Sequence, residues 1–236
     1  LHTIKTINMV NVTQKNFNFL EKLRKNNNRD WFSDNKSEYQ TQHEEMISFA
    51  DSLLQKISSH DQIETVSGKK SLFRIYRDVR FSKNKAPYKT HWAGGFKRAT
   101  KNLRGGYYFH IESGNKSMVA GGFWGPNKDD LARIREELAM DPTELRSIIT
   151  EQNFVDHFET LKGEQLKTAP KGYPKDHSSI DLLRFKQFIF HKSFTDEEVL
   201  SDDFADQLNE SFIAMRPFLD YMSDVLTTDS NGTPLI

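Results

Sequence analysis

Twelve lysines and arginines lie between Lys69 and Arg104, and this basic segment contains a single acidic residue, Asp78. Arginine binds phosphate and carboxylate groups through paired hydrogen bonds, and lysine binds them as a compact charge. Aromatic and imidazole side chains between the charges can stack on a base or sugar ring. The sequence therefore predicts an anion-binding surface over residues 74–91. Its predicted ligand-binding residues are Arg74, Tyr76, Arg77, Arg80, Lys85, Tyr88, Lys89 and His91.

A second charged region is acidic, since residues 196–229 hold ten acidic residues and one basic residue. The neutral net charge of the chain thus hides two opposed regions. Three interpretations remain open. The first is a binding protein or enzyme for a small anionic ligand that contains phosphate or carboxylate. The second is a non-catalytic module that binds nucleic acid or an acidic protein. In the third, the basic segment is structural and pairs with the acidic C-terminal helix.

Residues suited to acid–base chemistry lie close to this surface. Residues 107–112 alternate between apolar and polar side chains, as on a strand with one buried face, and the polar positions are Tyr108, His110 and Glu112. A histidine beside a carboxylate is a plausible base, although the solvated face of an ordinary sheet shows the same alternation. The polar loop predicted over residues 162–178 adds a further histidine. The candidate catalytic residues are Asp78, His110 and His177.

Arg77 stands apart from the other cations because it shares the odd positions of residues 72–80 with apolar side chains. A buried arginine needs a carboxylate partner. Asp78 points to the opposite face in this register. Arg77 is therefore either structural or held for a ligand.

The chain has no cysteine, which excludes disulfides, thiolate metal sites and cysteine nucleophiles. His43-Glu44-Glu45 lacks the second histidine of a zinc-protease helix, and His110 with Glu112 is too small a set without partners from elsewhere. Phosphate-binding loops, dinucleotide fingerprints and nucleophile elbows are missing from the sequence. The sequence therefore predicts no metal site and identifies no cofactor.

The sequence contains neither an apolar stretch long enough for a membrane helix nor the apolar core of a signal peptide. We therefore expect a cytoplasmic protein that does not bind membranes. The predicted organisation is a disordered leader over residues 1–12, a single α+β domain over residues 13–228 and a tail over residues 229–236.

Apolar periodicity gives the fold class. Helical spacing predicts helices over residues 13–26, 34–58, 130–139, 179–188 and 201–227, with another beginning at residues 141–144 and with Pro217 kinking or splitting the last. Short β-type runs separated by glycine pairs predict strands near residues 62–67, 71–79, 91–97, 106–113 and 117–124. The fold class is α+β: an antiparallel sheet of about five strands in residues 62–125, packed against the N- and C-terminal helices.

Two motifs carry a resemblance to a known family. They are Arg74-Ile75-Tyr76-Arg77-Asp78-Val79-Arg80-Phe81-Ser82 and Lys85-Ala86-Pro87-Tyr88-Lys89-Thr90-His91. From about Phe17 to Leu226 the chain resembles a bacterial and fungal family known as domain of unknown function 2461. Ala86 and Ser178 depart from it, since the family commonly has a hydroxyl residue and a proline there. The resemblance implies no particular activity, cofactor or catalytic residue.

Overall fold

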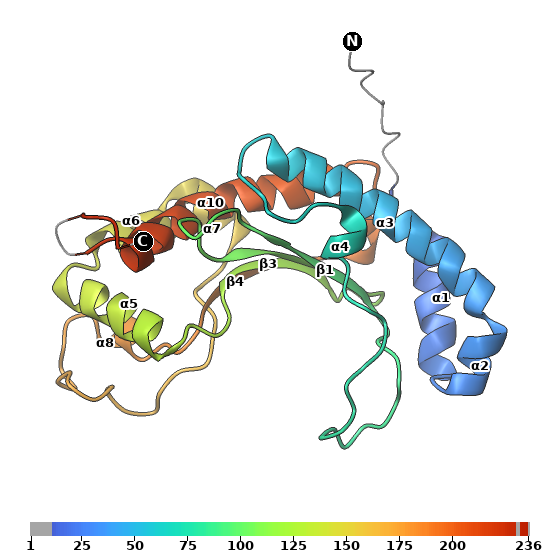
Figure 1. The fold of residues 1–236 in the computed structure, drawn as a ribbon, viewed down its shortest axis with the longest axis horizontal. Coiled ribbons are helices and arrows are strands. Elements are labelled where there is room, and N and C mark those ends of the chain that lie inside the picture. The colour runs from blue at the N-terminus through green and yellow to red at the C-terminus, as the bar shows by residue number, and fades with distance from the viewer. Residues whose placement is uncertain (1–10, 230–231, 236) are drawn as a thin grey trace, which may run out of the picture. The chain divides into compact units, whose positions relative to one another are not determined.

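Four antiparallel strands form the sheet of this protein, in the order β1-β2-β3-β4 (Figure 1). The computed structural model describes residues 11–229 and 232–235. Residues 1–10 of the predicted leader and residues 230, 231 and 236 of the predicted tail lie outside this range. The strands are β1 Trp92–Lys97, β2 Gly106–Ile111, β3 Ser117–Phe123 and β4 Phe188–Phe194. The predicted α+β class and the antiparallel sheet between N- and C-terminal helices are confirmed, whereas the predicted number of five strands is wrong.

The chain divides into two compact units that interleave along the sequence. The first unit contains the described residues up to Phe96, together with Tyr108–Val119 and Ser193–Glu210. The second contains Lys97–Tyr107, Ala120–Lys192 and the described residues from Ser211 onward. Because the strands run from one unit into the other, neither unit is continuous in sequence. One domain over residues 13–228 stays a prediction.

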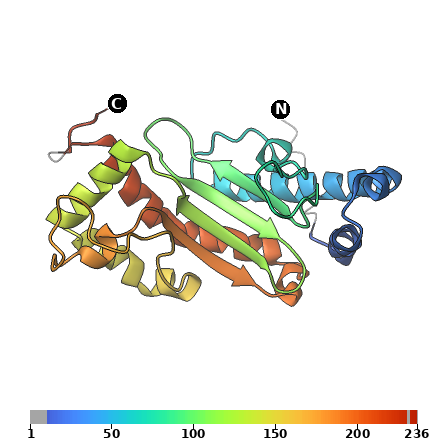
Figure 2. The same cartoon turned by 90° about the horizontal axis from the view of Figure 1, so that it is seen from below.

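The first unit packs its helices on one face of its strands. The helix predicted over residues 13–26 is present as α1 Gln14–Lys25, which Thr13 caps and three asparagines follow. Phe109 of β2 is fully buried, and Phe49 of α3 meets it edge to face at 6.1 Å between ring centroids. The opposite face of β2 carries the polar side chains, and Figure 2 shows the strands from the side opposite α3, which passes behind β1. The helices of this unit are α1 Gln14–Lys25, α2 Arg29–Asp34, α3 Lys36–Ser58, α4 Gly68–Ser71 and α9 Asp196–Val199, with the start of α10 Phe204–Thr227.

The second unit is held by aromatic contacts between α10 and its strands. Phe218 of α10 lies 5.0 Å from Phe190 of β4 and 6.2 Å from Phe123 of β3, measured between ring centroids. Phe154 of α7 packs on the same Phe190 at 4.7 Å. The remaining helices of this unit are α5 Lys128–Met140, α6 Thr143–Thr150, α7 Gln152–His157 and α8 Ile180–Leu183. None of the helices described is long and apolar enough to cross a membrane.

The two N-terminal strands of the predicted sheet are absent from the structure. Residues 62–67 contain no strand, and residues 71–79 form only isolated bridges, Leu72 with Gly94 and Tyr76 with Tyr88. The partner stretch contains Pro87, whose carbonyl accepts from the Arg77 N–H at 2.9 Å but which has no N–H to donate in return. A loosely paired segment over residues 72–91 therefore takes the place of a regular hairpin.

The fourth strand lies where the sequence predicted the end of a helix. The helix predicted over residues 179–188 is only the four-residue α8, and β4 begins at Phe188. Phe188 and Phe190 point to the buried face of β4, as strand alternation requires. The last predicted helix is present as α10, which continues through Pro217 without a split, and the alternative of a kink at Pro217 stays a prediction.

Candidate functional site

Half-buried side chains on the polar face of β2 form a hydrogen-bonded row in the first unit. Residues of one strand at spacing two point to the same face, so Tyr108, His110 and Glu112 are neighbours. The Tyr108 hydroxyl lies 3.1 Å from Nδ1 of His110, and Nε2 of His110 lies 3.0 Å from Oε2 of Glu112. The predicted alternation is confirmed on the other face, where Tyr107, Phe109 and Ile111 are buried.

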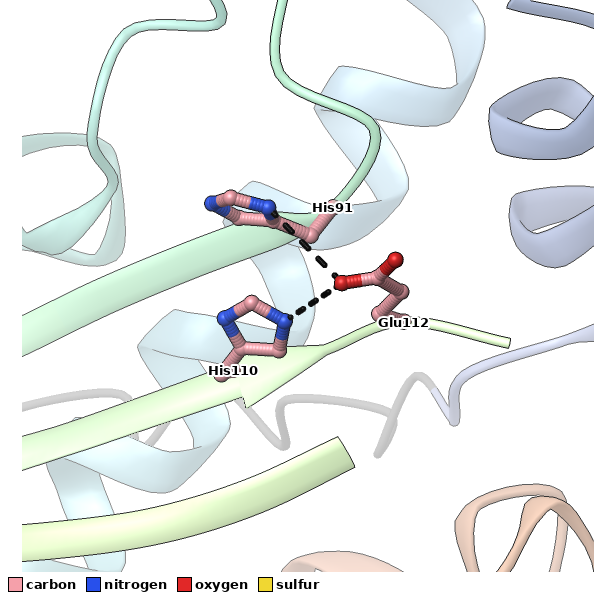
Figure 3. Close-up of side chains that lie close together, drawn as sticks. All are labelled: His91, His110 and Glu112. Carbon is pink, nitrogen blue, oxygen red and sulfur yellow. Dashed lines mark hydrogen bonds and ion pairs between the residues drawn. The ribbon is translucent and has the colours of Figure 1, made fainter. Parts of the chain in front are cut away.

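His91 extends this row from the residue directly before β1, the strand that neighbours β2. Its ring centroid is 4.2 Å from that of His110, and its Nδ1 is 4.0 Å from Oε2 of Glu112 (Figure 3). Burial, with the neighbouring His110 adding to it, lowers the pKa of His91 to about 4. The imidazole of His91 is therefore neutral at pH 7 and holds a free electron pair on one ring nitrogen.

A recess of about 320 Å³ opens beside His91 in the first unit. The end of α1 forms part of its wall, and the 72–91 segment forms the rest. Two of its cations, Arg77 and Lys89, bond only to backbone or hydroxyl oxygens. Arg77 donates to the Ala86 carbonyl at 2.9 Å, and Lys89 donates to the Arg74 carbonyl at 2.7 Å. The lining residues are Arg24, Asn27, Arg77, Asn84, Ala86, Tyr88, Lys89, Thr90 and His91.

The electrostatics of the recess are strongly positive. Neither Arg77 nor Lys89 forms an ion pair with any residue that the structure describes. Burial, together with the charge of Arg74, lowers the pKa of the Lys89 ammonium. Arg24 is different, since its guanidinium lies 2.9 Å from Oε1 of Glu112. Two cations that pair with no carboxylate in the described part of the chain thus line the same recess.

The 72–91 segment is anchored to the first unit by the side chain of Asn27. The Asn27 amide donates to the Tyr88 carbonyl at 3.0 Å and accepts from the Tyr88 N–H at 3.1 Å, as a neighbouring strand would. Tyr88 also stacks on Phe32 of α2, with ring centroids 4.0 Å apart. These contacts hold the segment that supplies most of the recess wall.

Replacing Asn27 with alanine is expected to loosen this wall without unfolding the unit. Two hydrogen bonds to a buried backbone are lost, each contributing about 1 kcal/mol. Hydrogen exchange followed by mass spectrometry should show faster exchange over residues 74–91 and unchanged exchange in α3. Asn26→Ala is the matched control, because its amide bonds only to the Lys22 carbonyl of its own helix. Equal exchange in both variants would contradict the anchoring role.

The structure brings only part of the predicted site together. Of the predicted ligand-binding residues, Arg77, Tyr88, Lys89 and His91 line the recess. The others belong to the same segment but do not line it: Arg74, Tyr76, Arg80 and Lys85. Arg80 instead pairs with Asp78 at 2.7 Å on the surface, and this hydrogen-bonded pair lowers the pKa of Asp78. The predicted ligand-binding roles of Arg74, Tyr76, Arg80 and Lys85 and the predicted catalytic role of Asp78 remain predictions.

The three predicted catalytic residues lie in different surroundings. His110 belongs to the row on β2 beside His91, and Asp78 is held by Arg80 away from the recess lining. His177 belongs to the second unit, where its Nδ1 accepts from the Ser179 N–H at 3.0 Å and its ring packs edge to face on Tyr173. The structure therefore joins only His110 to residues of the recess.

Two residues of the recess could not be found by inspecting the basic segment. Arg24 and Asn27 lie some fifty to sixty residues earlier in the chain. Arg24 belongs to the last turn of α1, and Asn27 lies in the turn between α1 and α2, so both look like ordinary helix-end and turn residues. Glu112 stands in the alternating polar row, so its position was visible while its ion pair with Arg24 was not. Long-range contacts of this kind carry no local sequence signal.

Comparison with known proteins identifies one family. The family of conserved hypothetical proteins DUF2461 matches residues 15–221. Searches of the curated proteins and of the solved structures find no match. The matched range contains both basic motifs, the recess and the row on β2. The chain therefore belongs to the conserved hypothetical protein family DUF2461.

Proposed function

We propose that the protein binds a small anionic ligand, one that carries phosphate or carboxylate, in the recess of the first unit. One observation carries the proposal: Arg77 and Lys89 both line the recess, and neither is neutralised by a carboxylate of the described chain. Arginine and lysine held in this way favour a bound anion, because the alternative is an uncompensated, partly buried charge.

The dimensions of the recess favour a small molecule over a polymer. A volume of about 320 Å³ is at the lower end of the range for small-molecule sites, roughly 300–1,000 Å³. Asn27, Asn84 and Thr90 add polar groups to the wall. Such groups orient a ligand, whereas binding to nucleic acid relies on charge spread along a surface.

A thermal-shift titration with inorganic phosphate and pyrophosphate tests this function. The protein is first stripped of metal on a chelating resin, and ionic strength is held constant with chloride. A ligand at one hundred times its Kd stabilises the native state by about 2.7 kcal/mol, which raises the Tm of a protein of this size by roughly 5–10 °C. Arg77→Gln and Lys89→Gln should each weaken binding by about 10- to 100-fold, because each removes a charge-assisted hydrogen bond.

Arg80→Gln is the matched control, since it makes the same change of charge in the same segment but outside the recess lining. For each variant, the Tm with phosphate or pyrophosphate is compared with the Tm of the same variant in chloride alone, so that a change in its stability without ligand does not affect the comparison. A titration in which no anion raises the Tm of the wild-type protein would refute the proposal. A loss in Arg80→Gln as large as that in Arg77→Gln would instead support a diffuse basic surface and a polyanionic partner.

A further inference from the structure

Two imidazoles and one carboxylate converge on a common point at the edge of the sheet (Figure 3). His110 and Glu112 point to one face because they are two residues apart along β2 and its continuation. His91 reaches the same point from the start of the neighbouring strand β1. Within the described part of the chain these are the one group of three such residues whose ligand atoms all lie within 4.8 Å of one another.

The separations of these atoms are close to those around a bound metal ion, all being within 4.8 Å. Nitrogen and oxygen ligands about 2.1 Å from a tetrahedral metal lie about 3.4 Å from one another. Oε2 of Glu112 is 3.0 Å from Nε2 of His110 and 4.0 Å from Nδ1 of His91. The first separation also fits a hydrogen bond, but the second is too long for one. Small side-chain rotations would place all three atoms in a metal's first coordination sphere.

We propose that His91, His110 and Glu112 bind one divalent transition-metal ion. Two imidazole nitrogens with one carboxylate oxygen suit zinc, iron and cobalt, whereas magnesium and calcium prefer oxygen ligands throughout. Three protein ligands leave at least one coordination position for water or for another ligand. The inference goes beyond the anion-binding proposal and does not depend on it, although His91 belongs to both sites.

Neighbouring residues orient the ligand atoms in the way that outer-shell partners do. Arg24 lies 2.9 Å from Oε1 of Glu112, which leaves Oε2 directed at the two imidazoles. The Tyr108 hydroxyl lies 3.1 Å from Nδ1 of His110. If Nδ1 holds the proton and donates it to this hydroxyl, Nε2 presents its electron pair to the metal. The Glu112 N–H donates to the Ser117 hydroxyl at 3.0 Å, which fixes the backbone at the end of β2.

Positive side chains nearby oppose metal binding by charge. Arg24 and Lys116 both face Oε1 of Glu112, and Arg77 and Lys89 contribute to the field at His91. This field repels every divalent cation to the same degree, so only an ion with strong bonds to the imidazole nitrogens, as transition metals form, would overcome it. It also favours an anion beside the metal, so the open coordination position and the recess suit the same negatively charged ligand.

Titration of the full chain with cobalt chloride tests the site. The protein is stripped on a chelating resin and titrated in a buffer whose only small anion is chloride. We expect one cobalt ion per chain, with the visible absorption bands of a low-symmetry protein site, and displacement by an equivalent of zinc. Loss of an outer-shell partner typically weakens metal binding by about 10- to 100-fold. Tyr108→Phe should fall in that range, and His91→Ala, His110→Ala and Glu112→Gln should lose at least as much.

The control variant is His157→Ala, which removes an imidazole of the second unit from outside the cluster. Circular dichroism spectra show whether each variant is folded, and Glu112→Gln keeps the shape of the side chain if an alanine variant fails. Failure of the wild-type protein to bind cobalt would overturn the proposal. So would cobalt binding that survives Glu112→Gln and His110→Ala, since the ion would then lie elsewhere. Neither result bears on phosphate binding, which is measured without metal.

Discussion

Replacing Gly122 with alanine is expected to destabilise the second unit by roughly 3–5 kcal/mol. Gly122 lies in β3 with φ at +124°, a conformation that side-chain-bearing residues rarely adopt. A Cβ atom at this position would also lie 2.1 Å from the carbonyl oxygen of Phe188, the first residue of β4. The conflict is with backbone, which cannot rotate away as a side chain can. Alanine would therefore combine conformational strain with separation of two paired strands.

Two glycine controls separate these contributions, and the measurement is the urea midpoint followed by circular dichroism. Gly172 also has positive φ, at +96°, but has open space around its Cβ position, so Gly172→Ala should cost about 1–2 kcal/mol. Gly125 has open space and no positive φ, and Gly125→Ala should change stability by less than about 0.5 kcal/mol. A Gly122→Ala midpoint equal to that of Gly172→Ala would show that β4 does not pack against β3 at this position.

The alternation of apolar and polar residues was sufficient to predict β2, a strand with one buried face and one polar face. Residues 106–111 alternate strictly, and the structure buries Phe109 and exposes His110 partly, as predicted. The predicted strand at 71–79 has similar alternation but fails, because Pro87 in its partner cannot complete the ladder. Ile75 is still buried in that segment, while Phe73 is half exposed. The side-chain pattern thus predicted the burial of Ile75 but not the exposure of Phe73, and it did not predict the missing strand pairing.

The fourth strand shows a different limit of sequence reasoning. Phe188 and Phe190 are separated by one residue, yet the preceding residues 179–185 also fit a helical turn, and α8 does form there. A strand that pairs with β3 over an intervening stretch of helices has no turn signal beside it. The choice between helix and strand at Phe188 is made by tertiary pairing, which a local pattern does not contain.

The sequence predicted the positive charge of the candidate site but not the spatial arrangement of its side chains. The excess of lysine and arginine over residues 74–91 predicted an anion-binding surface, which stays a prediction, but it did not predict that Arg80 pairs with Asp78. The sequence predicted no metal site, because His110 and Glu112 alone are too small a set of ligands. His91 completes the group only because β1 and β2 are neighbours in the sheet. Strand order is therefore the information that the sequence lacked.

One interpretation of the sequence was that the acidic C-terminal region neutralises the basic segment. In the second unit, Arg98 of the basic segment does pair with an acidic residue of that region. This residue is 1% exposed, and its guanidinium pairs with Asp220 of α10. It also donates to the Ser223 hydroxyl at 3.3 Å and to the Arg104 carbonyl at 3.4 Å. Arg98 is therefore a buried structural cation, in contrast to Arg77 and Lys89 of the first unit.

Replacing Arg98 with alanine is expected to destabilise the protein by about 3 kcal/mol or more, because it removes a fully buried side chain and leaves its hydrogen-bond partners unsatisfied. Arg216→Ala is the matched control: Arg216 pairs with the same Asp220 at 3.4 Å, but 41% of its side chain is exposed. An exposed ion pair contributes about 0–1 kcal/mol, so this control should barely move the urea midpoint. Increasing salt should reduce the difference in urea midpoint between the wild type and Arg216→Ala. The difference between the wild type and Arg98→Ala should stay the same, since buried charges are screened little. Equal midpoints for the two variants would contradict the stabilising role of the buried Arg98–Asp220 ion pair.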